Sequence, residues 1–180
     1  MLRLLEPSVV FSEEIKAYRE EFLRQGGSMD GCGSLRKYED PRDWLAEVEA
    51  LKKEETAPEG FVPMTQFLSI REEDQKLVGM IQIRHYLNEY LEKFGGHIGY
   101  SVRPGERRKG YATEMLRMVL PECAKLDVPR VLITCRQENE GSRRVILHNG
   151  GVYESTVHEP DRDVYLERYW IDLSKRNLKK

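Results

Sequence analysis

The sequence predicts an α/β protein with a mixed sheet flanked by helices, and two observations carry this prediction. In the first part of the chain, apolar residues at helical spacing are followed by runs that alternate between two faces, as in an antiparallel hairpin. Further on, a strand-like, a helix-like and a second strand-like run follow one another, which indicates a parallel crossover. A chain of 180 residues is one domain's worth, so we expect a single domain over residues 1–180.

Two helices are expected before the hairpin. Ser12 is an N-cap candidate followed by two glutamates, and apolar residues recur at helical spacing as far as the glycine pair at 26–27. The Asp-Pro pair at 40–41 starts a second helix, whose apolar stripe reaches Leu51. The Gly-Cys-Gly segment at 31–33 lacks periodicity, so we expect a loop there.

The remaining elements follow from the same periodicities. A polar turn at 71–76 separates the two strands of the hairpin, and a helix with one apolar face begins near Thr113 and reaches Cys123. A turn at 159–161 joins a final hairpin. The expected strands are 62–70, 77–83, 98–102, 131–135, 152–154 and 164–173.

A basic turn stands between strand 98–102 and the helix that begins near Thr113. It reads Arg-Arg-Lys-Gly-Tyr-Ala at 107–112. The first turn of a helix has N–H groups without intrahelical partners and carries the positive end of the macrodipole, so an anion is stabilised there. Gly110 lets the backbone approach a ligand, and the basic side chains add donors. The turn therefore predicts a ligand with phosphate groups.

Two better-known phosphate loops do not fit this turn. The nucleoside-triphosphate loop requires a lysine directly after its second glycine, whereas Gly110 is followed by Tyr111 and Ala112. A dinucleotide fingerprint needs three spaced glycines early in a strand-helix-strand unit and an acidic ribose ligand downstream. This turn has only Gly110 and Ala112 in place of the three glycines, so the dinucleotide loop is excluded as well.

The pattern that remains is Arg-x-x-Gly-x-Ala, with Arg107, Gly110 and Ala112 at its three places. An Asn-x-x-Ser element follows at 139–142, and a glycine pair stands at 150–151. Order and spacing over roughly fifty residues resemble the acetyl-coenzyme A site of the GNAT superfamily of N-acetyltransferases.

The segments Ile-Arg-His-Tyr-Leu-Asn at 83–88 and Gly-Gly-His-Ile-Gly-Tyr at 95–100 look like a bacterial subgroup of predicted acetyltransferases. The resemblance implies the GNAT fold, in which the central sheet splays to admit the pantetheine arm of acetyl-coenzyme A or coenzyme A. It places the 31–33 loop near the acceptor. The cofactor-binding residues so implied are Tyr100, Val102, Arg107, Arg108, Lys109, Gly110, Tyr111, Ala112, Thr113, Asn139 and Ser142.

Acetyl transfer to an amine needs a neutral amine, a donor for the thioester oxyanion and an acid for the leaving thiolate. The resemblance implies direct transfer without an acyl-enzyme, with a backbone N–H near Val102 as the oxyanion donor. The family's usual acid is a tyrosine four residues after Ser142, where this chain has Ile146. The source of the proton therefore stays open between another side chain, a water and solvent.

Two histidines are candidate bases. His97 lies in the run that leads to strand 98–102, and His85 follows strand 77–83. Either could deprotonate an ammonium group through water, and either is equally a structural, hydrogen-bonded histidine. Cys135 ends strand 131–135 near the expected thioester, where it is a nucleophile or, as is usual in an apolar strand, a packing residue.

Composition narrows the class of protein. The chain is 39% hydrophobic and 33% charged with a formal net charge of -2, so nucleic acid is a poor default partner. It has no apolar run of the ~18 residues needed to cross a bilayer, and residues 1–7 do not continue as a signal peptide, so we expect a cytoplasmic protein. Its three cysteines and four histidines lack metal-site spacing, so we expect no metal.

The function most consistent with these features is transfer of acetyl from acetyl-coenzyme A to a primary amine. The acceptor stays open among small amines, amino acids, aminoglycosides and protein amino termini. Two alternatives are a non-catalytic coenzyme A-binding sensor or partner-binding module, which Ile146 favours, and an RNA-binding domain built on the arginines at 103, 107, 108, 143 and 144. A homodimer could form if residues 169–173 lie at a sheet edge.

Overall fold

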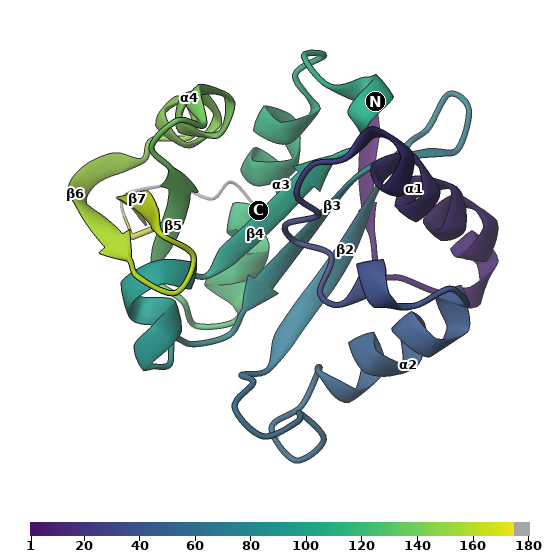
Figure 1. Ribbon diagram of the computed structural model, residues 1–180, viewed down its shortest axis with the longest axis horizontal. Coiled ribbons are helices and arrows are strands. Elements are labelled where there is room, and N and C mark those ends of the chain that lie inside the picture. Colours follow the sequence, from purple (N-terminus) through teal and green to yellow (C-terminus); the bar gives the residue numbers. More distant parts are fainter. Residues whose placement is uncertain (175–180) are drawn as a thin grey trace.

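The computed structural model describes residues 1–174, which form two sheets with helices on their faces (Figure 1). The end of the predicted domain, residues 175–180, lies outside the described residues. The strands are β1 (Leu2–Leu5), β2 (Met64–Arg71), β3 (Lys76–Arg84), β4 (Ile98–Val102), β5 (Arg130–Arg136), β6 (Val152–Glu159) and β7 (Val164–Asp172). The longer helices are α1 (Ser12–Gln25), α2 (Pro41–Ala50), α3 (Tyr111–Lys125) and α4 (Glu140–His148). Four short helical turns are η1 (Val9–Phe11), η2 (Leu35–Lys37), η3 (Leu91–Gly95) and η4 (Pro104–Glu106).

The strands pair in the orders β1-β2-β3-β4 and β5-β7-β6, and every ladder is antiparallel. The predicted α/β class is confirmed, but the expected mixed sheet is divided into two antiparallel sheets, because β4 and β5, which the crossover connects, form no ladder. β4 and β5 instead meet where His97 N donates a hydrogen bond of 2.8 Å to Leu132 O. Beyond that bond the two strands belong to separate sheets, so the structure contains the splay that the resemblance implies.

The four-stranded sheet separates two apolar clusters. On one face α1 and α2 pack against β2 and β3, with Trp44, Tyr18 and Phe22 fully buried. On the other face α3 packs against β3, and the cluster continues into β5 and β7. Figure 1 shows α3 behind the sheet and α1 and α2 in front of it. Burial of both faces holds β4, which leads into the basic turn, in a fixed place.

Three local features differ from the sequence predictions. The strand β1 was not anticipated; it pairs with β2, Leu4 lying opposite Ser69. The turn η3 was also missed. Ser12 does not cap α1, because Phe11 occupies the N-cap position and the buried Ser12 hydroxyl has no hydrogen-bond partner. The predicted cap of α2 is confirmed, since the Asp40 carboxylate accepts from Arg42 N.

The last strand does not lie at a sheet edge. β7 runs between β5 and β6, and residues 169–170 are paired with both neighbours, whereas residues 171–172 are paired with β5 alone. Tyr169 and Ile171 are also buried. The predicted edge pairing therefore does not hold for residues 169–170, because β7 pairs with β5 as well as with its predicted hairpin partner β6.

Candidate cofactor and acceptor site

The basic turn leaves β4 through η4 and opens α3. Gly110 is the N-cap of α3 and has a φ of +83°, in the left-handed region that favours glycine. The first hydrogen bond of the helix runs from Glu114 N to Gly110 O at 3.1 Å. The N–H groups of residues 111–113 precede that bond, so none has an acceptor one turn earlier in α3. The backbone therefore presents donors at the end of the helix that favours an anion.

A buried carboxylate anchors the turn. Glu106 is 4% exposed, and its carboxylate contacts Arg71 Nη1 at 2.8 Å, Lys76 Nζ at 2.7 Å and Lys109 Nζ at 2.8 Å. Burial tends to raise the pKa of Glu106, but the hydrogen bonds from Lys109, Lys76 and Arg71 outweigh it and lower this pKa to about 2. The ammonium group of Lys109 is thus paired with Glu106, and this ion pair helps to hold the turn in place.

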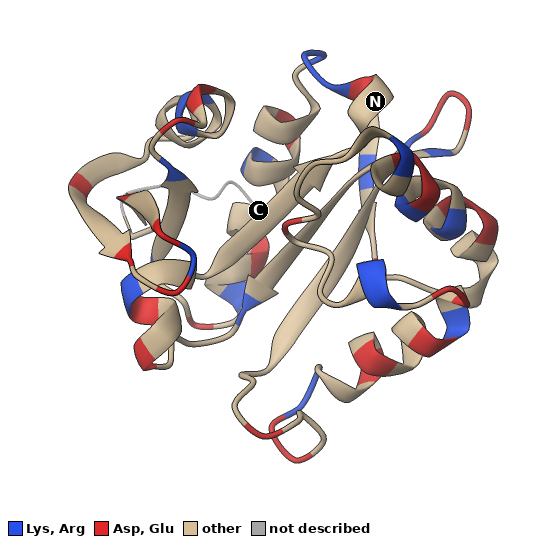
Figure 2. Cartoon of the chain, viewed as in Figure 1, with Lys and Arg blue, Asp and Glu red and all other residues tan. Residues whose placement is uncertain are grey.

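The other two basic residues of the turn differ in their surroundings. Arg107 donates to Val102 O at 3.3 Å, and its guanidinium lies over the Phe22 ring, 5.6 Å from the centroid. Arg108 is exposed, has a φ of +62°, and has no carboxylate partner in the described part of the chain. Figure 2 shows this turn as a blue segment at the top of the molecule. Arg108 is therefore the guanidinium most available to an added anion.

We predict that Arg108→Ala weakens coenzyme A binding about 10- to 100-fold, because a charge-assisted hydrogen bond contributes on the order of 1.5–3 kcal/mol. The free energy of unfolding should stay within about 0.5 kcal/mol of wild type, since the side chain is exposed. Isothermal titration calorimetry measures the affinity, with Lys53→Ala as a control for a lost surface charge. An unchanged affinity would remove Arg108 from the phosphate site.

The gap between β4 and α4 is bridged by side chains. Tyr100 Oη and Ser142 Oγ lie 2.7 Å apart, and Asn139 caps α4 by accepting from Ser142 N at 3.0 Å. The fold thus brings Tyr100, Asn139 and Ser142 together beside the splay, from segments that are about forty residues apart. The carboxamide oxygen of Asn139 is occupied by this cap, so its first role is to shape the start of α4.

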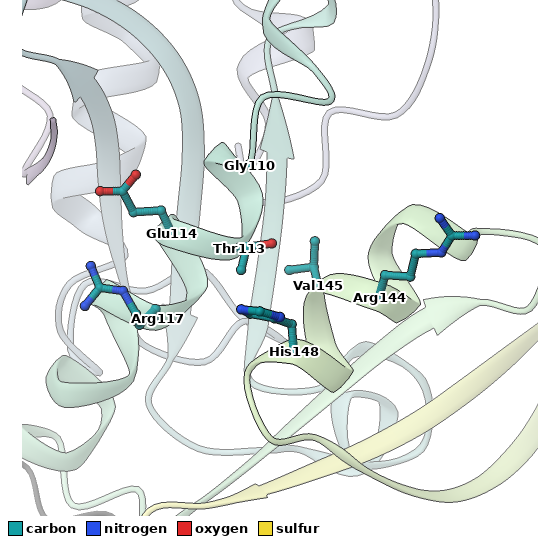
Figure 3. Close-up of a pocket in the computed structure, with 7 residues that line it drawn as sticks. All are labelled: Gly110, Thr113, Glu114, Arg117, Arg144, Val145 and His148. Atoms are coloured by element: carbon teal, nitrogen blue, oxygen red, sulfur yellow. The ribbon is translucent and has the colours of Figure 1, made fainter.

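A pocket of ≈ 420 Å³ lies between α3 and α4, next to the basic turn. Figure 3 shows Val145 and His148 pointing from α4 toward α3. The lining residues are Gly110, Thr113, Glu114, Arg117, Arg144, Val145 and His148. Arg117 and His148 were not predicted to lie in the site. Each stands at helical spacing from another pocket residue, Arg117 from Thr113 and His148 from Arg144, but no sequence pattern indicates that these faces of α3 and α4 meet.

His97 is tied into the junction of the two sheets. It is 7% exposed, and its Nδ1 accepts a hydrogen bond of 3.0 Å from Leu132 N. Burial, and then the nearby Arg84 guanidinium, lowers the pKa of His97 to about 4. His85 Nε2 lies 2.8 Å from Thr65 Oγ1, and burial lowers its pKa as well. Both histidines stay predicted bases, while the geometry of His97 supports a structural role.

His97 should make stability depend on pH. Its pKa is about 4 in the folded protein and 6.5 as the ordinary value, so protonation favours the unfolded chain. The stabilisation is complete above about pH 6.5 and falls as the pH drops toward 4, by about 2 kcal/mol at pH 5. Urea unfolding at pH 7.5 and 5 should show a smaller loss for His97→Gln than for wild type. Equal losses would contradict this assignment.

The loop between α1 and α2, which the resemblance places near the acceptor, packs against β4. Gly31 O accepts from Gln66 Nε2 at 2.8 Å, and Gly31 N lies 3.0 Å from a Cβ built on Gly99. Cys32 Sγ and Tyr18 Oη lie 3.2 and 3.1 Å from Ser101 Oγ. This buried cluster fixes the predicted loop to the strand that carries Tyr100.

Cys135 is not poised as a nucleophile. It is 6% exposed, and burial, followed by the charge of Glu167, raises the pKa of its thiol to about 11. A thiol of this pKa is protonated near neutral pH, and the thiolate is the reactive form. Packing is therefore the role that its surroundings support.

Within residues 1–174, no group of three or more His, Cys, Asp or Glu is placed to hold a metal ion. None of the described helices is both long and apolar enough to cross a bilayer.

The fold and the site define a protein with a helix start that suits a diphosphate beside a splayed sheet. The chain belongs to the acetyltransferase (GNAT) domain family, which matches residues 13–152. It is an acetyltransferase, and its cofactor is acetyl-coenzyme A or coenzyme A. A comparison with curated protein sequences found no match to the chain.

Similar solved structures cover nearly the whole chain. One is a ribosomal-protein alpha-N-acetyltransferase, RimL, in complex with coenzyme A, with a TM-score of 0.71, 14% identity and coverage of 97% of this chain and 96% of that one. Another is a ribosomal-protein-S5-alanine acetyltransferase from Vibrio fischeri, with a TM-score of 0.68, 16% identity and coverage of 97% and 93%. A third is the spermidine/spermine N-acetyltransferase SpeG from Vibrio cholerae, with a TM-score of 0.62, 15% identity and coverage of 97% and 95%. At these identities the likeness supports the fold.

Proposed function

We propose that this protein transfers the acetyl group of acetyl-coenzyme A to a primary amine by direct attack. The observation that carries the proposal is the left-handed Gly110 cap, which presents the N–H groups of residues 111–113 beside the gap between β4 and β5. Diphosphate oxygens fit such a helix start. Acetyl-coenzyme A supplies the activated thioester, and the protein supplies binding, orientation and donors.

The predicted residues divide by position. The backbone of Tyr100 and Val102 faces the splay and suits the amide groups of the pantetheine arm. Residues 107–113 suit the diphosphate, and Ser142 lines the opposite wall. The pocket between α3 and α4 continues this surface, and its Arg117, Arg144 and His148 suit the nucleotide end. These assignments place the cofactor along one continuous surface, which runs from α4 to the loop at 31–33.

Direct transfer is supported by the absence of a thiolate among the described cysteines. Cys32, Cys123 and Cys135 are all buried, and burial raises the pKa of each thiol to between about 11 and 12. An amine that attacks the thioester carbonyl itself needs no such nucleophile. A backbone N–H near Val102 would stabilise the oxyanion of the tetrahedral intermediate by donating a hydrogen bond to it.

The test is a panel of amines with release of free thiol as the readout. The panel holds small amines, amino acids, aminoglycosides, spermidine and peptides with free amino termini. We expect release with at least one member and coenzyme A binding by calorimetry. Coenzyme A binding with no turnover across the panel would favour the sensor or partner-binding module, the alternative that Ile146 supports.

We also propose a cytoplasmic location, which cell fractionation tests. A homodimer is a further proposal, which sedimentation tests.

A further inference from the structure

Tyr100 presents its hydroxyl where the two sheets separate. Ile98, Tyr100 and Val102 alternate along β4 and contribute to the apolar cluster that contains α3 and β5. Tyr100 Oη reaches Ser142 Oγ of α4 at 2.7 Å and lies 3.4 Å from Ser142 O. The phenol therefore spans the opening through which the pantetheine arm is proposed to pass.

The groups around this hydroxyl keep it protonated. Burial raises the pKa of Tyr100 well above its ordinary range, and the charge of Asp30, in the loop between α1 and α2, acts in the same direction, as does Cys135 when it ionises at high pH. The hydrogen bond with Ser142 opposes them without restoring the ordinary pKa. Tyr100 thus offers an O–H donor throughout the neutral and mildly alkaline range.

α4 itself offers no polar group one turn further on. Ile146 is fully buried, and a Cβ built on Gly151 would lie 2.9 Å from Ile146 O, so the site is closely packed. Ser142 and Tyr100 are the hydroxyl groups that the structure places at this wall of the splay. Of the two, the phenol is the stronger hydrogen-bond donor toward an anion because it is the more acidic.

We propose that Tyr100 Oη donates a hydrogen bond to the sulfur that leaves during acetyl transfer. This assignment rests on the proposed function. As the amine nitrogen forms its bond to the carbonyl carbon, the C–S bond breaks and its electron pair stays on sulfur. The nitrogen loses its proton to water, and the thiolate charge is stabilised by the Tyr100 O–H.

The phenol keeps its own proton in this step. A tyrosine ordinarily has a pKa of about 10 and a thiol about 8.5, so the proton is held more tightly by oxygen than by sulfur. Tyr100 therefore acts as an electrostatic donor, comparable to an oxyanion-hole group, and the products are the amide, a thiolate and a proton in water.

The decisive measurement is the pKa of the coenzyme A thiol while it is bound. It is obtained from a pH titration of the ultraviolet absorbance of the thiolate, after the absorbance of the protein without coenzyme A is subtracted. A donor to sulfur stabilises the thiolate, so Tyr100→Phe should raise the bound-thiol pKa by about one unit, a tenfold change. Tyr153→Phe is the matched control, because its hydroxyl contacts Thr156 on β6 at 2.9 Å and should leave the thiol unchanged. The pKa of Cys135 is about 11, so a titration below about pH 10 reads the cofactor.

Kinetics give an independent readout. With any amine that is turned over, Tyr100→Phe should lower kcat about 10- to 100-fold, with little change in KM for acetyl-coenzyme A. Equal bound-thiol pKa values in wild type and Tyr100→Phe would overturn this assignment while leaving the proposed function standing. Failure of wild type to bind coenzyme A would overturn both.

Discussion

Replacing Gly31 with alanine is expected to lower the free energy of unfolding by about 2–5 kcal/mol, or to prevent folding. Two effects add. Gly31 has a φ of +75°, which costs an L-residue about 1–2 kcal/mol. A Cβ there would also lie 2.6 Å from Tyr100 Cα, and a backbone atom cannot yield as a flexible side chain can. The loop at 31–33 would have to move away from β4.

Gly26→Ala separates the two effects. Gly26 also has a φ of +75°, but a Cβ there meets nothing within 4 Å. Gly26 has a ψ of −173°, in a region that is nearly restricted to glycine, so its cost should be the conformational penalty alone, about 1–3 kcal/mol. Urea unfolding of both variants measures the difference. Equal losses would show that Gly31 does not hold the loop close to the strand, and would weaken every assignment that depends on this contact.

Glu106→Gln should be the second most damaging change, with a loss of about 2–3 kcal/mol in the free energy of unfolding. The substitution keeps the shape of the side chain but leaves Arg71, Lys76 and Lys109 without the carboxylate that they share. Because these cations are partly exposed, the loss should be smaller than for a fully buried ion pair.

The pH dependence tests the same carboxylate. The pKa of Glu106 is about 2 in the folded protein against an ordinary value of 4.5, so its stabilisation is present above about pH 4.5. It should be lost as the pH falls toward 2, and the variant should lack this acid-sensitive part. Glu122→Gln is the control, since its pair with Lys125 is exposed and should contribute at most about 0.5 kcal/mol. A similar loss in both variants would contradict the anchoring role.

Much of the cofactor loop could be predicted from the sequence because its chemistry is local. The left-handed Gly110, the start of a helix directly after it and the basic side chains all depend on neighbours in the chain. The partners of those side chains could not be predicted. Lys109 is engaged with Glu106 while Arg108 is free of carboxylates in the described structure, and this distinction arises from β2 and β3, which bring Arg71 and Lys76 to the same carboxylate.

The sequence by itself determined the family, the helix start that suits a diphosphate and the loss of a tyrosine at position 146, because motifs and periodicity depend on residues that are near one another in the chain. Only the tertiary structure decided where β4 and β5 begin to separate, which is after His97, that β7 is an inner strand, and that Tyr100 meets Ser142. These contacts join segments far apart in sequence. Their geometry follows from how two apolar clusters pack across the sheet, which no local pattern records.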